Sequence, residues 1–145
     1  MLGNASFQVI VVSNQRCVSE GLLTVCELDS VNERMCRKLA AAGAVIADGE
    51  YCPHDLQPPR DCGRPAPGML LQASRDHGIN LAASWMIGDS DIHIEADREA
   101  GCRTARTLRN EEHDRIGAEV LADSLFSAAQ QILLFMRSLD DVNRP

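Results

Sequence analysis

Short, almost wholly apolar runs alternate along the chain with stretches whose apolar residues recur at helical spacing. The runs at residues 7–12, 44–47 and 85–87 predict strands, and a more polar fourth run at 103–108 predicts a strand at an edge of the sheet. Apolar runs rich in β-branched residues suit parallel strands that are buried on both faces.

Helical periodicity separates these runs. It predicts a first helix with an apolar stripe of Val31, Met35 and Leu39, an N-cap at Asp29 or Ser30, and an end at Gly43. The four expected helices span residues 28–42, 67–77, 92–100 and 124–138. Strands that alternate with helices predict an α/β fold with a mostly parallel sheet, in one domain over residues 1–145.

Charge and composition argue against two kinds of binding partner, nucleic acids and membranes. The formal net charge is −7, the pI is near 5.0, and aromatic residues make up 3% of the chain, which argues against nucleic-acid binding. No apolar run has the roughly 18 residues that a membrane span needs. The N-terminus shows no signal-peptide pattern, so we expect a cytoplasmic protein without membrane contact.

Polar side chains follow two of the predicted strands. Ser13 and Asn14 come after the first strand, and Asp89 and Asp91 come after the third. In open α/β sheets ligands bind at the carboxyl ends of the strands. An Asp placed there can hold Mg²⁺, or can merely cap the next helix. Ser13 and Asn14 can donate to a phosphate, or can serve the chemistry of a turn.

A proline-rich segment, residues 51–68, carries a third group of candidates. Cys52, His54 and Cys62 have the donor types of a structural Zn²⁺ site, although a closed site needs four ligands. Arg64 precedes a predicted helix and could neutralise a phosphate, or could be an ordinary solvated loop side chain.

These segments resemble the haloacid dehalogenase (HAD) superfamily of phosphatases. More narrowly, they resemble the family of heptose-1,7-bisphosphate 7-phosphatases and histidinol-phosphatases. Four segments of this sequence carry the resemblance: Val-Ile-Val-Val-Ser-Asn-Gln, Tyr-Cys-Pro-His, Cys-Gly-Arg-Pro-Ala-Pro-Gly-Met-Leu and Met-Ile-Gly-Asp-Ser.

The family implies a Rossmann-like domain in which an Asp nucleophile attacks the phosphorus of a small sugar phosphate, with Mg²⁺ as cofactor. By resemblance, Ser13 binds phosphate, Asn14 contacts the substrate, and Arg64 stands where the family places a phosphate-pairing Lys. Asp89 matches the metal-binding acid, with Asp91 as a second Mg²⁺ candidate. The positions that match ligands of the family's structural Zn²⁺ loop are Cys52, His54 and Cys62.

The chain also departs from the family pattern. The family's first strand carries Asp-x-Asp-Gly-Thr upstream of the Ser13 position, and none of the 12 residues before Ser13 is Asp. Arg60 replaces a zinc-ligand Cys, Gly63 replaces a substrate-binding Arg, and His93 replaces a second acidic residue. We therefore expect a fold without its central strand, and a chain that alone is inactive.

Two further consequences are expected. Strands that lose a central neighbour expose edges through which the chain could form a homodimer. Three hypotheses about function stay open: a heptose-bisphosphate-type phosphatase, a histidinol-phosphate phosphatase, and a non-catalytic protein that binds a phosphorylated ligand or a partner.

Overall fold

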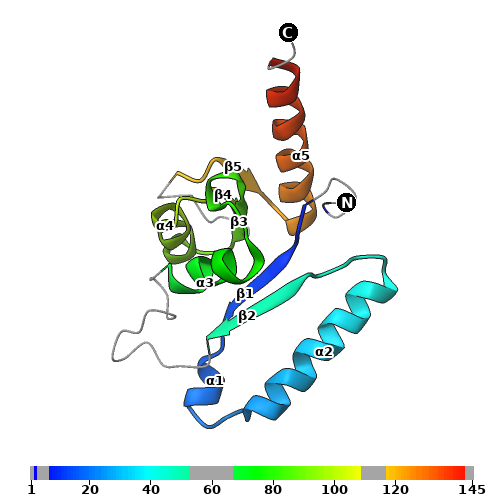
Figure 1. Ribbon diagram of the computed structural model, residues 1–145, viewed down its shortest axis with the longest axis vertical. Coiled ribbons are helices and arrows are strands. Elements are labelled where there is room, and N and C mark those ends of the chain that lie inside the picture. The colour runs from blue at the N-terminus through cyan, green and yellow to red at the C-terminus, as the bar shows by residue number, and fades with distance from the viewer. Residues whose placement is uncertain (1, 3–6, 53–66, 109–116, 143–145) are drawn as a thin grey trace. The chain divides into compact units, whose positions relative to one another are not determined.

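The computed structural model describes residues 2, 7–52, 67–108 and 117–142, without the side chains of residues 92, 93, 96 and 140–142. The chain divides into two compact units, Met1–Ala73 and Ser74–Pro145. Each unit is described by itself below, with the element labels of Figure 1. Within the described residues, no helix is long and apolar enough to cross a membrane.

The first unit contains a pair of parallel strands. Strand β1, Ile10–Asn14, lies beside strand β2, Asp48–Cys52, with Ile10 opposite Asp48 and Asn14 opposite Cys52 (Figure 1). The prediction of a strand at residues 44–47 was wrong. That apolar run leads into the strand, and only its last residue joins the pairing, through the bond from the Ala47 N–H to the Val9 carbonyl.

Two helices connect β1 to β2. Helix α1, Arg16–Ser19, is a single turn that the sequence analysis missed, and α2 spans Val25–Ala41. The N-cap of α2 is Thr24, not Asp29 or Ser30. The Thr24 hydroxyl accepts from the Glu27 N–H, and the Glu27 carboxylate accepts from the Thr24 N–H, which together form a capping box.

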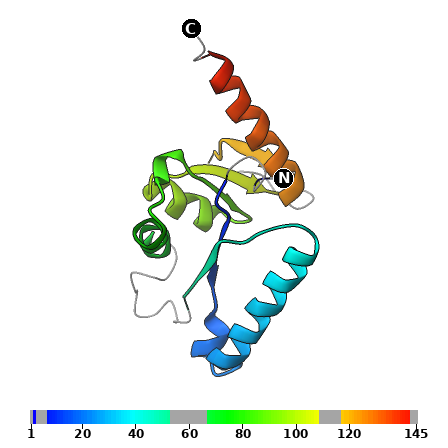
Figure 2. The ribbon, with the colours of Figure 1, turned by 45° about the vertical axis from the view of Figure 1, so that its right-hand side comes forward.

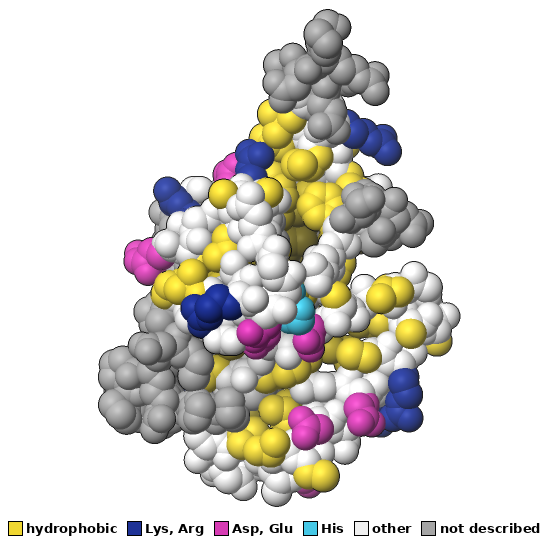
Figure 3. All heavy atoms as spheres, in the orientation of Figure 1, with side chains coloured by type: hydrophobic (Ala, Val, Ile, Leu, Met, Phe, Trp, Pro, Cys, Tyr) yellow, Lys and Arg dark blue, Asp and Glu magenta, His cyan; other side chains and the backbone are white. Residues whose placement is uncertain are grey.

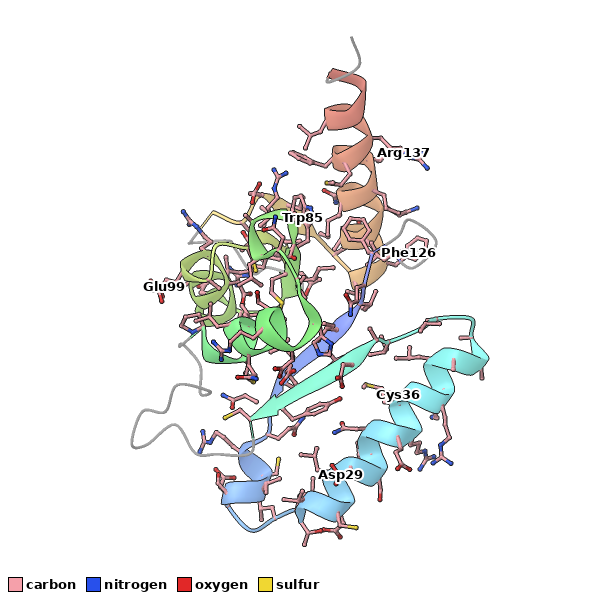
Figure 4. All side chains as sticks on the ribbon, in the orientation of Figure 1. Asp29, Cys36, Trp85, Glu99, Phe126 and Arg137 are labelled. Carbon is pink, nitrogen blue, oxygen red and sulfur yellow. The ribbon has the colours of Figure 1, made fainter. Side chains whose placement is uncertain are left out.

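The Glu27 carboxylate accepts from the Thr24 N–H and also from the Thr24 hydroxyl, and these two bonds lower the pKa of Glu27 below its usual value, the backbone bond being the larger cause. The predicted end of α2 is confirmed, since Gly43 follows the helix with a φ of 77°, a left-handed conformation that glycine adopts without strain. Figure 4 shows Cys36 on the side of α2 that faces β2.

The second unit contains a three-stranded parallel sheet in the order β3-β4-β5. Strands β3, Trp85–Gly88, and β4, Arg103–Thr107, match predicted strands, but β4 lies in the centre of this sheet and not at an edge. Strand β5, Val120–Ala122, was missed because three residues after a charged segment carry too little pattern to be recognised. The prediction of α/β architecture with parallel strands is confirmed.

Four helical segments complete this part of the chain. Helix α3, Gly68–His77, begins in the first unit and ends, as expected, just before Gly78. A 3₁₀ turn at Leu81–Ala83 precedes β3, and α4, Asp91–Glu99, follows it. The last helix, α5, spans Leu125–Val142 and ends four residues beyond the predicted end at residue 138.

Helices α4 and α5 cover opposite faces of the three-stranded sheet (Figure 2). Arg103 lies on the α5 face, where its guanidinium packs over the rings of Trp85 and Phe135 at 4.6 and 4.1 Å. The largest apolar side chains of the core are Ile94 of α4 and Ile132 of α5, at 0% and 1% exposure. Hydrophobic side chains also reach the surface along α5 (Figure 3), among them Phe126.

One edge of β1 and one edge of β3 carry no partner strand within the described residues. Strand β1 pairs there with β2 alone, and β3 pairs with β4 alone. Every residue of both strands is half-buried, whereas the three middle residues of β4 are buried. Apolar strands such as β1 and β3 are usually buried on both faces, so these two strands are more exposed to solvent than their sequences lead us to expect. A homodimer through these edges stays a prediction.

We expect the thiol of Cys102, just before β4, to make the stability of the second unit depend on pH. Burial, and then the charge of Asp97, raises its pKa from 9.0 to about 11. A raised folded-state pKa means that stability present below pH 9 is lost as the pH rises towards 11. We expect unfolding free energy to fall by about 2–3 kcal/mol across this window.

Urea unfolding at pH 8.5 and 11, followed by the fluorescence of Trp85, the single tryptophan of the chain, tests this expectation. The Cys102→Ala variant should lose most of the pH dependence, and Cys36→Ala, which removes an exposed thiol, should keep it. An equal pH dependence in Cys102→Ala and the wild type would assign the effect to other groups.

Candidate functional site

The carboxyl end of β1 presents three consecutive polar side chains. The Gln15 amide donates to the Ser13 hydroxyl oxygen at 2.8 Å, and both residues are half-buried. The Gln15 backbone N–H donates to the Cys52 carbonyl at 2.8 Å, which fixes Gln15 beside the end of β2. Because the Ser13 oxygen already accepts a bond, its own O–H is directed to donate elsewhere.

Asn14 adds an amide to this strand end. Its Oδ1 atom is buried, and it has no hydrogen-bond partner among the described residues. A buried amide oxygen without a bond costs free energy unless a ligand or water donates to it. Ser13 and Asn14 thus supply a donor and an acceptor at one strand end, and the binding of a phosphate there stays a prediction.

The carboxyl end of β3 carries the two candidate acids of the second unit. Asp89 directly follows Gly88, and its side chain is exposed. Asp91 is the first residue of α4, and its carboxylate accepts from the guanidinium of Arg106. The two acids are separated only by Ser90 and lie in different surroundings: Asp89 faces solvent and Asp91 binds a buried cation.

Arg106 is a residue that the sequence analysis did not single out. It lies on β4 opposite Gly88, and only 5% of its surface is exposed. The next residue, Thr107, donates from its hydroxyl to the Gly88 carbonyl at 3.3 Å. The signal that could have found Arg106 is a single charge inside the run Thr-Ala-Arg-Thr, because an arginine in a buried strand is rarely without a specific partner.

The other candidates divide between described and undescribed residues. Cys52 ends β2 with no exposed surface. Arg64, His54 and Cys62 lie outside the described residues. Among the residues that the structure describes, no group of three His, Cys, Asp or Glu side chains is placed to hold a metal ion.

The chemistry at the end of β3 suits Mg²⁺ better than Zn²⁺. Mg²⁺ is usually held by one or two carboxylates, with water and substrate phosphate completing its oxygen shell. The exposed Asp89 carboxylate fits that role. A structural Zn²⁺ site would need several nitrogen or sulfur ligands at short distance, and the described residues contain no group of three side chains placed to provide them.

Comparison with known proteins adds independent information. Residues 61–125 match the family model described as HAD-hydrolase-like. The Pseudomonas aeruginosa D-glycero-beta-D-manno-heptose-1,7-bisphosphate 7-phosphatase is 32% identical over 70% of this chain and 57% of its own length. The Escherichia coli K12 protein of the same name is 31% identical over 84% of this chain and 68% of its own length. The chain thus spans a little over half of the first of these relatives.

A solved structure shares the fold. The crystal structure of D,D-heptose 1,7-bisphosphate phosphatase from B. bronchiseptica, complexed with magnesium and phosphate, matches 92% of this chain and 78% of its own. The TM-score is 0.82 and the sequence identity is 26%.

Proposed function

Because this chain belongs to the haloacid dehalogenase (HAD) superfamily, we propose that it forms the phosphate- and metal-binding part of a phosphatase that acts on a small sugar phosphate. The observation that carries this proposal is that each unit has polar side chains at the carboxyl end of a parallel strand: Ser13 and Asn14 on β1 in the first unit, and Asp89 directly after β3 in the second. The similarity to heptose-1,7-bisphosphate 7-phosphatases supports a heptose bisphosphate as the substrate.

Ser13 and Asn14 bind the substrate in this proposal. The Ser13 hydroxyl, oriented by the Gln15 amide, donates to a phosphate oxygen, and the Asn14 Oδ1 atom accepts from a substrate hydroxyl. Arg64, on the segment before α3, provides a cation for the same phosphate. A guanidinium binds phosphate through two parallel hydrogen bonds, so it can neutralise charge and orient the group at once.

Asp89 holds Mg²⁺ in this proposal. When bound, the ion would neutralise charge on the phosphoryl group that is transferred. The Asp89 carboxylate supplies one oxygen ligand at the end of β3, and its exposure leaves room for water and phosphate on the same ion. Asp91 was a second candidate ligand, but its bond to Arg106 favours the different role argued below.

Mn²⁺, a paramagnetic substitute for Mg²⁺, tests the metal site in the 145-residue chain. We expect Mn²⁺ to broaden the backbone NMR signals of Gly88, Asp89 and Ser90, and excess Mg²⁺ to restore them. The Asp89→Asn variant should weaken this binding by about tenfold or more, because it removes a charged ligand.

Glu99→Gln is the matched control for Asp89→Asn. Glu99 is exposed and lies at the far end of α4 (Figure 4), so its loss removes one negative charge without touching the β3 end. If both variants weaken Mn²⁺ binding equally, the ion responds to net charge and Asp89 is not a ligand.

We assign the nucleophile of such a phosphatase to none of the 145 residues. The first Asp of the sequence is Asp29, on α2, and β1 contains none. Without a carboxylate that attacks phosphorus, binding of phosphate and Mg²⁺ produces no covalent turnover. We therefore propose that the 145 residues alone bind a phosphorylated ligand and do not hydrolyse it.

A structural Zn²⁺ site is a separate proposal for the segment after β2. Cys52, whose side chain is fully buried, would be its first ligand, with His54 and Cys62 as two of the three further ligands that a closed site needs. We expect the purified chain to contain about one zinc per molecule by elemental analysis. Cys52→Ser should lose most of it and Cys36→Ser, at an exposed thiol, should retain it. A wild-type chain without zinc would refute the site.

A further inference from the structure

The ion pair between Arg106 and Asp91 joins the turn after β3 to the neighbouring strand. Arg106 lies on β4, directly opposite Gly88, the last residue of β3. Asp91 begins α4, so only Asp89 and Ser90 separate the two tied positions. The side chain of Arg106 is 7% exposed and that of Asp91 is 34% exposed, so the pair runs from the interior to the rim of the sheet.

Thr107 ties the same turn from the other face of the sheet. Consecutive residues of a strand point to opposite faces. Arg106 therefore reaches Asp91 on the α4 face, while Thr107 donates to the Gly88 carbonyl from the opposite side. The bond from the Ile94 N–H to the Ser90 carbonyl, at 3.2 Å, then begins the regular helix. The turn that contains Asp89 is thus bonded to β4 at two points, through Gly88 before Asp89 and through Asp91 after it.

Stability alone does not account for a buried arginine at this position. Removing two charges from water costs several kcal/mol per ion, and apolar side chains of similar volume often stabilise a protein as well or better. The buried pair fits better with a requirement for fixed geometry, because a displacement of about 1 Å in a functional group can cost about a hundredfold in activity.

We propose that Arg106 is a positioning residue for Asp89, and that it acts through Asp91. The pair holds the Gly88–Asp91 turn against β4 so that the Asp89 carboxylate points to one place at the end of β3. Asp91 serves the turn in this arrangement and is not a metal ligand. The inference rests on the proposed function insofar as Asp89 is the ligand of Mg²⁺.

Hydrogen exchange on the metal-free chain tests the positioning role. The double variant Asp91→Asn with Arg106→Met removes both charges together, so the net charge at the site stays the same. We expect the Ile94 amide to exchange about tenfold faster or more, because its bond to Ser90 closes the turn. The Leu108 amide, bonded to the Ala122 carbonyl on the far side of β4, should stay within about twofold of the wild type.

Mn²⁺ titration of the same proteins gives the second readout. The double variant should bind Mn²⁺ at the Asp89 turn about threefold more weakly or worse, although no net charge has changed. Arg106→Lys keeps the cation, and should recover both the Ile94 protection and the Mn²⁺ affinity in part. Glu119→Gln breaks the other arginine pair of β4, with Arg103 on the opposite face, and should change neither.

Each contrary result overturns a stated part of the proposal. Ile94 exchange within twofold of the wild type would show that the pair does not hold the turn. Equal acceleration at Ile94 and Leu108 would show a general structural role. Tighter Mn²⁺ binding in Arg106→Met alone would identify Asp91 as a ligand that Arg106 competes for. If Mn²⁺ leaves Asp89 unaffected in the wild type, the metal site fails, while the exchange result still decides the positioning role.

Discussion

Replacing Asp91 alone with asparagine should lower the free energy of unfolding of the second unit by about 2–3 kcal/mol. The variant leaves the Arg106 guanidinium, which is almost fully buried, without its carboxylate partner. Breaking a buried ion pair by removal of one partner typically costs more than this. We expect the lower figure because the Asp91 side chain is one-third exposed, and solvent screens the interaction.

Urea unfolding monitored by Trp85 fluorescence measures this cost in the unit that contains the pair. Glu119→Gln is the matched control, since it breaks the pair of Glu119 with Arg103, which lies on the same strand as Arg106, and the Glu119 side chain is 41% exposed. An exposed pair of that kind contributes about 0–1 kcal/mol. The double variant of Asp91 and Arg106 should recover most of the loss, because it leaves no unpaired buried charge.

The account of the pair would be contradicted by two results. One is a cost of Asp91→Asn no larger than that of Glu119→Gln. The other is a double variant as unstable as Asp91→Asn, which would show that the carboxylate itself, and not its pairing with Arg106, stabilises the unit.

The positions of the two strand ends that carry the proposed function could be predicted from the sequence. Val11, Val12 and Ile87 are apolar residues in short runs, and such runs place the polar residues that follow them at the carboxyl end of a buried strand. Ser13 and Asp89 were therefore found without the structure. The helix ends at Gly43 and Gly78 could also be predicted, because glycine commonly follows the last turn of a helix. In the structure both residues have a positive φ, as that position requires.

The details that sequence reasoning missed depend on partners distant in the chain. The second strand begins at Asp48 because pairing with Ile10 sets its register, which overrides the apolar run that precedes it. Strand β4 looked like an edge strand because it contains Arg103 and Arg106. The first packs over two aromatic rings and the second binds Asp91, so both charges are accommodated within the centre of the sheet.

The absence of turnover by the 145 residues is the expectation with the largest consequence. In the proposed function Ser13 donates to phosphate and the exposed Asp89 carboxylate holds Mg²⁺. The chain offers no Asp on β1 or before it. In a covalent mechanism the nucleophile forms the bond to phosphorus as the alcohol leaves. Without a nucleophile, the chain can bind and orient the substrate, but it cannot expel the alcohol.

Phosphate release by the purified 145-residue chain therefore tests the central claim most directly. The substrate is a heptose 1,7-bisphosphate in the presence of Mg²⁺, and released phosphate is compared with buffer alone and with the Asp89→Asn variant. The account predicts release at the buffer rate for both proteins, together with Mn²⁺ binding that only the wild type retains. A Mg²⁺-dependent rate that Asp89→Asn abolishes would contradict it, and would show that these residues contain a complete phosphatase.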